Sequence, residues 1–194
     1  MKHRRRIGFD VMVPFVLVAL VFGVLVWQKY REAGRLPDAP PGQQGTALVQ
    51  KVVLLYANGE GKLVREAREV ERCGDRSDCL RFLLDELFSG PISDLTNVYP
   101  EWTTVNSVTI ENGLAIIDLG GDFAEGLPAG SSAEMLAVYG IVNTVCANLP
   151  EITQVQISID GNRQARLRHL DLSEPLTPYR DMEAPQAEPS QERN

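Results

Sequence analysis

The longest apolar stretch of the chain lies near its start, where residues 11–27 read VMVPFVLVALVFGVLVW without a charged side chain. A helix of that length extends about 26 Å, close to the roughly 30 Å hydrocarbon core of a bilayer. Basic residues precede the stretch, and Trp27 and Tyr30 follow at the position of an interfacial aromatic belt. The pattern predicts a basic cytoplasmic leader over residues 1–10 and a transmembrane helix over residues 11–28, with the rest of the chain exported.

A cleaved signal peptide is the alternative interpretation of this N-terminal stretch. Cleavage requires small residues after a short apolar core, whereas this chain continues WQKYREAGR, with bulky or charged side chains. No cysteine stands near the end of the stretch to accept a lipid. The sequence therefore favours an uncleaved signal anchor in the cell membrane, with a cytoplasmic N-terminus and a periplasmic or external C-terminal domain.

The composition changes twice after the predicted anchor. Residues 29–49 are rich in Pro and Gly and predict a flexible stalk, which spans about 25 Å if it behaves as a random coil. Residues 177–194 are rich in Pro and Glu and predict a disordered tail. Residues 50–176 lie between them and are numerous enough to form one domain with its own core.

Short apolar runs within this domain predict two strand pairs. Residues 52–56 (VVLLY) are wholly apolar, and the Asn-Gly-Glu-Gly turn after them favours a strand over a helix for residues 62–70. Residues 103–110 and 114–119 flank Glu111-Asn112-Gly113, and Asn-Gly is typical of a two-residue hairpin turn.

Residues 153–160 show the clearest alternation of apolar and polar positions, which predicts a strand with one buried and one wet face. The polar side chains that we expect on the wet face are Gln154, Gln156 and Ser158. A turn at Asp160-Gly161-Asn162 leads to a last predicted strand, residues 163–167.

Two segments have the period of amphipathic helices. The first begins at a cap formed by Ser77 or Asp78 and ends at Gly90-Pro91. The second begins with Ser131 as N-cap and Glu134 reaching back in a capping box, and it ends before Pro150. Residues 120–130 are predicted as a loop. The order β-α-β-β-α-β, with an extra strand after the first and the last of these strands, predicts an α+β fold, a two-layer sandwich of a mainly antiparallel sheet packed by two helices.

Charge is divided unevenly along the chain. Residues 1–36 hold seven Lys or Arg and two acids, a net charge of +5, so the remainder carries −12 of the overall −7. An exported domain of that charge repels nucleic acid and anionic lipid headgroups. We therefore expect no nucleic-acid partner.

Cysteine usage leaves one pairing open. Cys73 and Cys79 stand in the polar segment CGDRSDC and form either a disulfide in an oxidising compartment or two free thiols. Cys146 lies on the apolar side of the second predicted helix, as a small core residue.

Few residues suggest chemistry. His169 and Asp171 could act as a base and its orienting acid, but no nucleophile accompanies them, and a turn at Ser173 is the simpler interpretation. The acids of the segment DLGGDFAEG do not match the spacing of an EF-hand loop; they are Asp118, Asp122 and Glu125. Asn143 lies beside the apolar face of a helix, and we expect its amide to bind backbone in a neighbouring loop. The sequence predicts no catalytic site, metal site or cofactor.

Six segments of the domain occur in an order that is typical of one family. They are Leu84–Leu87 with Gly90-Pro91, Leu114–Leu119 followed by Asp122-Phe123, Glu134–Val145, Leu149–Ile152, Val155–Gly161 and His169–Leu176. Together they resemble the GerMN domain, the sporulation and spore-germination domain of bacterial envelope proteins. The resemblance covers residues 50–176.

The resemblance implies an extracytoplasmic domain without a known active site, similar in topology to the ring-building modules that assemble channels between membranes during spore formation. Members are anchored by a membrane helix or a lipid, and some are fused to or found with peptidoglycan amidases. This chain has one copy of the domain where the sporulation protein has two. We therefore expect a non-enzymatic cell-envelope module that binds envelope proteins or itself; the alternative is a peptidoglycan-binding or regulatory module that works with a cell-wall amidase.

Overall fold

The computed structural model of this chain describes Leu20, Trp27 and residues 49–185. Contacts divide the chain into two units, residues 1–45 and 46–194, and the second holds the domain. The predicted leader, most of the predicted anchor and stalk, and residues 186–194 lie outside the described residues. Within the described part of the chain, no helix is long and apolar enough to cross a membrane.

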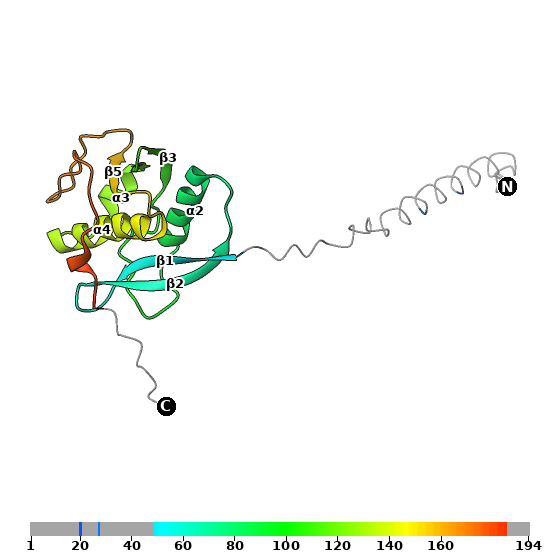
Figure 1. The fold of residues 1–194 in the computed structure, drawn as a ribbon, viewed down its shortest axis with the longest axis horizontal. Coiled ribbons are helices and arrows are strands. Elements are labelled where there is room, and N and C mark those ends of the chain that lie inside the picture. The colour runs from blue at the N-terminus through cyan, green and yellow to red at the C-terminus, as the bar shows by residue number, and fades with distance from the viewer. Residues whose placement is uncertain (1–19, 21–26, 28–48, 186–194) are drawn as a thin grey trace, which may run out of the picture. The chain divides into compact units, whose positions relative to one another are not determined.

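The domain contains five strands, three α-helices and one 3-10 helix in residues 49–185 (Figure 1). In chain order these are β1 (Val49–Ala57), β2 (Leu63–Glu71), α2 (Arg76–Phe88), β3 (Val105–Glu111), β4 (Leu114–Leu119), α3 (Gly121–Gly126), α4 (Ser131–Asn148), β5 (Gln154–Ile159) and η1 (Arg180–Met182). The prediction of an α+β fold is confirmed. The choice of a strand for residues 62–70 is also confirmed, because β2 occupies this segment.

The strands form two sheets, where the sequence predicted one mainly antiparallel sheet. β1 and β2 make an antiparallel hairpin, and β3, β4 and β5 make a separate sheet. The predicted turn between β3 and β4 is confirmed, because Asn112 and Gly113 both have positive φ, 48° and 83°. β5 runs parallel to β4, since a long connection through α3 and α4 returns the chain to the same end of the sheet.

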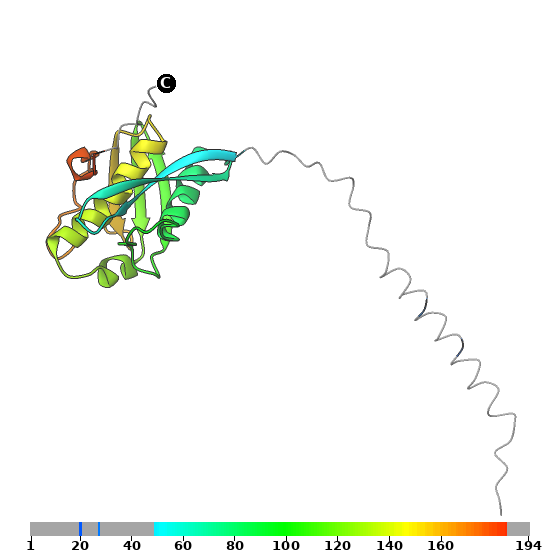
Figure 2. The same ribbon diagram turned by 90° about the horizontal axis from the view of Figure 1, so that it is seen from below.

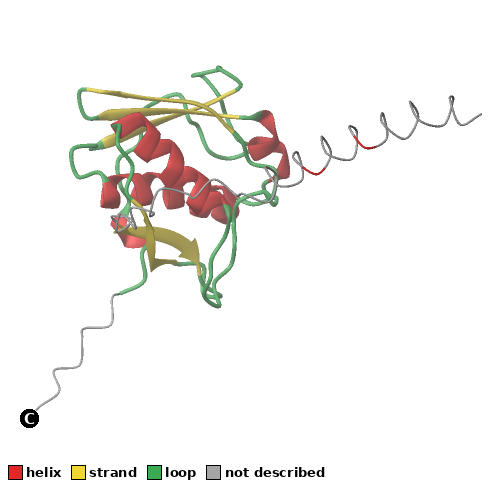
Figure 3. Ribbon diagram, turned by 90° about the vertical axis from the view of Figure 1, so that its right-hand side faces the viewer, coloured by secondary structure: helices red, strands yellow, loops and turns green. Residues whose placement is uncertain are grey.

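The helices α2 and α4 lie between the two sheets (Figure 2 and Figure 3). α4 packs against β1 on one side and β5 on the other, and α2 packs against β3 and β1. Leu54 and Tyr56 from one face of β1 join the main core, whereas Leu55 packs with Leu63 and Leu136 in a second, smaller cluster. The prediction of two layers was therefore wrong, because a two-stranded and a three-stranded sheet bury apolar residues against opposite sides of the helices.

Side chains of α4 cover the outer edge of β1. Asn148 accepts a hydrogen bond from the N–H of Val53 at 2.8 Å and donates to its carbonyl oxygen at 2.7 Å. Thr144 accepts from the N–H of Leu55 at 3.1 Å, and the Tyr99 hydroxyl donates to the Leu55 carbonyl at 3.2 Å. Polar residues on a helix thus supply the partners that a further strand would otherwise provide.

The C-terminal segment covers two further edges. Leu176 exchanges two backbone hydrogen bonds of 2.8 Å with Val155 of β5, and Ala184 donates to the Leu63 carbonyl of β2 at 2.7 Å. Residues 177–185, predicted as part of a disordered tail, therefore pack on the domain. Residues 163–167 form no strand but turns, with a single bridge between Arg166 and Asp171.

Helix caps also differ from the predictions. Asp75, not Ser77 or Asp78, caps α2, and its side chain accepts from the N–H of Ser77 at 3.0 Å. Within the predicted loop 120–130 the chain forms α3. The first backbone N–H of α3, from Gly121, donates to the carboxylate of Asp160 at 3.1 Å. That partner is distant in the sequence, so local patterns could not reveal it.

Candidate functional site

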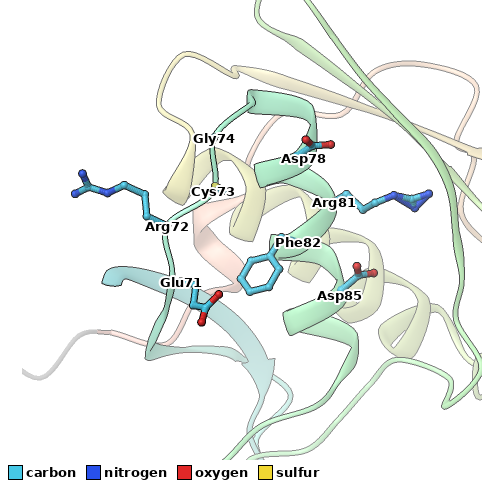
Figure 4. Close-up of a pocket in the computed structure, with 8 residues that line it drawn as sticks. All are labelled: Glu71, Arg72, Cys73, Gly74, Asp78, Arg81, Phe82 and Asp85. Carbon is cyan, nitrogen blue, oxygen red and sulfur yellow. The ribbon is translucent and has the colours of Figure 1, made fainter. Parts of the chain in front are cut away.

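A groove of about 370 Å³ lies between the end of β2 and the outer flank of α2 (Figure 4). A disulfide joins Cys73 to Cys79 beside it, with the two Cα atoms 5.2 Å apart. The residues that line the groove are Glu71, Arg72, Cys73, Gly74, Asp78, Arg81, Phe82 and Asp85. Four of them lie at positions i, i+3, i+4 and i+7 on one side of α2; they are Asp78, Arg81, Phe82 and Asp85. Three of the four are charged, so a pattern of apolar positions along the helix does not reveal this side.

The groove combines charges of both signs with one aromatic ring. Arg81 donates to the carbonyl oxygen of Val105 at 2.7 and 2.9 Å and to that of Asn106 at 3.2 Å, so it is held against β3. Burial raises the pKa of Asp85, while the nearby Arg81 opposes the shift. Because the two cysteines are bonded to each other, the groove offers no thiol nucleophile. Its chemistry suits binding of a polar chain rather than covalent catalysis.

His169 does not pair with Asp171, the acid that the sequence analysis considered and set aside as its orienting partner. Its Nδ1 lies 2.9 Å from Oε1 of Glu134, and its backbone N–H donates to Oε2 of the same residue at 2.8 Å. Leu170 donates a third hydrogen bond at 3.1 Å. Burial alone would raise the pKa of Glu134, but these hydrogen bonds outweigh it and lower the pKa.

Glu134 was predicted to complete a capping box, and this prediction was wrong. Gly130 occupies the N-cap position of α4, and Glu134 is 1 % exposed. It holds the turn at residues 169–170 instead. Asp171 accepts from the N–H of Ser173 at 2.9 Å, so the predicted local turn is present with Asp171 as its acceptor.

The acids of residues 118–126 do not gather into a metal site. Oδ1 of Asp118 accepts from the Ser158 hydroxyl at 2.6 Å and from the N–H of Gly161 at 2.7 Å. Burial raises the pKa of Asp118, but these bonds and one from Asn106 lower it overall. In residues 49–185 no three His, Cys, Asp or Glu side chains are placed to hold a metal ion.

The predicted wet face of β5 is mostly covered. Gln154 is exposed, but Gln156 and Ser158 are 7 % and 3 % exposed. Gln156 donates to the Leu172 carbonyl at 2.6 Å, because the segment after β5 folds back over this face. Asn143 behaves as predicted: its amide donates to the Tyr179 carbonyl at 3.1 Å and accepts from the Tyr179 N–H at 2.9 Å.

A buried ion pair on β2 was missed. Arg68 donates to Glu66 at 2.8 Å, to Glu86 at 3.0 Å and to the Gly90 carbonyl at 2.8 Å. Glu66 also accepts from the N–H and hydroxyl of Ser93. Burial would raise the pKa of Glu66, but the bonds from Ser93 and Arg68 lower it to about 2. The network ties β2 to the end of α2, which is a structural role.

A sequence profile of the Germane family, described as sporulation and spore germination, matches residues 53–165. This chain belongs to the Germane family. No curated protein sequence matches it.

This chain is similar to solved structures of other bacterial proteins. The tandem GerMN domains of the sporulation protein GerM from Bacillus subtilis are 18 % identical, with a TM-score of 0.54, over 76 % of this chain and 51 % of that one. The first GerMN domain of the same protein is 20 % identical, with a TM-score of 0.42, over 69 % and 97 %. A candidate lipoprotein from Clostridium perfringens is 23 % identical, with a TM-score of 0.47, over 66 % and 87 %. This Germane chain spans about half the length of the tandem protein, and the likeness to it is one of fold.

Proposed function

We propose that this chain is a non-enzymatic, membrane-anchored module of the cell envelope that binds protein partners. The observation that carries the proposal is the loop between α2 and β3, where Ile92 and Trp102 are 76 % and 74 % exposed. Trp is enriched at protein interfaces and supplies a large share of their binding energy. A Trp so exposed has its apolar area available to a partner.

The disposition of charge supports binding over catalysis. The buried carboxylates of Glu66 and Glu134 each accept hydrogen bonds that hold the fold together. The charged side chains of the groove lie beside the disulfide, and Arg81 among them is held by carbonyl oxygens of β3. Active sites instead gather several ionisable groups with altered pKa values in one pocket.

The proposed anchor is the apolar segment 11–28, with the N-terminus in the cytoplasm. The basic leader and the acidic remainder support this direction of insertion. Membership of the Germane family supports an envelope location. If the anchor spans the membrane, the full chain stays in the pellet after alkaline extraction of membranes, and a chain lacking residues 1–28 does not.

The test of partner binding is crosslinking of the full chain in cells. A photoactivatable side chain replaces Trp102, and a matched variant carries it at Glu60, an exposed residue in the turn between β1 and β2. We expect protein adducts from position 102 that mass spectrometry identifies and that position 60 does not give. Equal yields of the same adducts from both positions, or none from either, would refute partner binding through this loop.

Sedimentation with purified sacculi tests the alternative, a peptidoglycan-binding module. The full chain in detergent is mixed with sacculi and centrifuged. Under the proposal the chain stays in the supernatant. Recovery in the pellet, reduced by substitutions in the groove such as Asp85→Asn, would favour the alternative.

A further inference from the structure

In residues 49–185 the outer edge of β3 is open and nearly free of charged side chains, and this combination distinguishes it from the other edges of the two sheets. Side chains of α4 cover β1, and the C-terminal segment covers β5 and the start of β2. Beyond Leu63 the outer edge of β2 also stays open in the described domain. That stretch carries exposed charged side chains, which deter pairing with another strand; they are Arg65, Glu69 and Glu71. β3 has one charge, at its last residue, Glu111.

The hairpin register decides which groups of β3 point outward. Glu111 pairs with Leu114 across a two-residue turn, so Glu111, Thr109 and Ser107 direct their backbone groups toward β4. Val108 and Ile110 direct theirs away from the sheet. In residues 49–185, no hydrogen bond reaches these outward groups.

Arg81 limits the open edge at the other end. Its guanidinium group occupies the carbonyl oxygens of Val105 and Asn106, where β3 also has a bulge. The stretch that can accept a further strand is therefore Ser107–Glu111. It is short, has β-branched residues at its centre and bears no charge before its last residue.

We propose that Ser107–Glu111 pairs antiparallel with the same stretch of a second copy of this chain, about a twofold axis at Thr109. In this register Val108 lies opposite Ile110 of the second copy. By symmetry, Ile110 lies opposite Val108 of the second copy. Every outward N–H and C=O of the stretch then has a partner. The two three-stranded sheets become one continuous sheet. The inference rests on the proposed function and deepens it, because it names one partner.

Neighbouring registers are less favourable. An axis at Val108 would pair Ile110 with Asn106, whose carbonyl oxygen is already bound to Arg81. An axis at Ile110 would pair Val108 with Asn112, which has a φ of 48° in the hairpin turn and cannot continue a strand. Only with the axis at Thr109 do Val108 and Ile110 of each copy both pair with residues of the other copy whose backbone groups are free.

The side chains of this register are complementary. On the exposed face Thr109 meets Thr109, and Ser107 meets Glu111, so no like charges lie opposite each other. Glu111 of the second copy falls one residue from Asn106, where Arg81 is bound. An acid of one copy thus approaches a base of the other at both ends of the interface. β-branched cross-strand pairs add packing to the backbone hydrogen bonds.

Disulfide trapping tests the register in the full chain, in membranes of cells that produce it. Thr109 faces itself in a non-hydrogen-bonded pair, where Cα atoms are about 4.5 Å apart, within disulfide range. We expect Thr109→Cys to give a covalent dimer on mild oxidation. Gln154→Cys, exposed on β5 of the same sheet, and the parent chain with its free Cys146 are the controls. No dimer from Thr109→Cys, or an equal yield from Gln154→Cys, would overturn the proposal.

Charge exchange provides a second, independent readout. Thr109→Lys and Thr109→Glu each place like charges opposite each other on the axis, and Thr109 is exposed, so both monomers should keep the protease resistance of the parent. We expect two differently tagged copies of either variant to lose co-purification, and a Lys copy with a Glu copy to regain it. Undiminished self-association of either variant, or no recovery in the mixed pair, contradicts the proposal. Adducts from position 102 that persist in Thr109→Lys would leave the proposed function standing without this dimer.

Discussion

Replacing Glu66 with Gln tests the electrostatic contribution of a buried carboxylate to the stability of the domain. Glu66 is 7 % exposed, and its carboxylate accepts from Arg68 at 2.8 Å and from the N–H groups of Ser93 at 2.9 Å and Ile92 at 3.1 Å. Its pKa falls from 4.5 to about 2, and each pKa unit corresponds to about 1.4 kcal/mol of differential stability. Ionisation of Glu66 therefore stabilises the folded state by about 3 kcal/mol.

The sign of the pH dependence follows from the lowered pKa. The contribution is fully present above the unfolded pKa of 4.5 and is lost as the pH falls toward 2. Glu66→Gln keeps the shape of the side chain but has no charge, so it should be about 3 kcal/mol less stable than the parent at pH 7. The difference should shrink steadily between pH 5 and pH 2.

Urea unfolding of residues 46–194, followed by circular dichroism at pH 7, 5 and 3, measures both quantities. Glu60→Gln serves as the control, because Glu60 is exposed in a turn and no hydrogen bond of its carboxylate is found. A loss in Glu66→Gln that stays the same at all three pH values would refute the electrostatic reasoning and leave a packing effect.

Three further substitutions test separate parts of the fold, each by urea unfolding. Cys73→Ser with Cys79→Ser opens a short loop and should cost about 2 kcal/mol, and reductant should lower the parent to the same stability. Asn143→Ala removes both bonds to the backbone of Tyr179 and should cost about 1–3 kcal/mol, with faster hydrogen exchange in residues 179–184; unchanged exchange would mean that the amide does not hold this segment. Gly140→Ala places a Cβ against the Tyr99 hydroxyl and 3.4 Å from the Leu55 carbonyl, so it should cost about 2 kcal/mol, and a neutral effect would show that α4 can move away from β1.

Elements that depend on neighbouring residues were predictable. The hairpin at Asn112-Gly113 follows from the φ values that its turn requires, and β2 follows from the turn before it. The apolar positions of α2 include Leu80, Leu84 and Leu87, and all three are buried in the core. Helix caps were harder to predict, because several Ser and Asp residues stand near the start of α2, two Ser residues begin α4, and only backbone geometry selects the cap.

Residues of the candidate surfaces were largely unpredictable. Gln156 and Glu134 have sequence neighbours that suit an exposed strand and a helix cap. Both are buried because residues 163–176 fold back across the domain, and that path depends on contacts distant in the sequence. The groove was missed for a related reason, since the end of β2 has to lie beside the outer flank of α2 before it exists.

The sequence by itself determined the family, the α+β class, the hairpin turns and the apolar faces of the helices. The turns and the apolar faces rest on residues a few positions apart, and the class and the family rest on the order in which such local segments follow one another. Only the tertiary structure decided that the strands divide into two sheets, that β5 is parallel to β4 and that residues 177–185 pack on the domain. It also decided which sheet edges are covered. A sheet edge is covered or open according to what the rest of the chain places beside it, and a pattern of side chains along one strand does not contain that information.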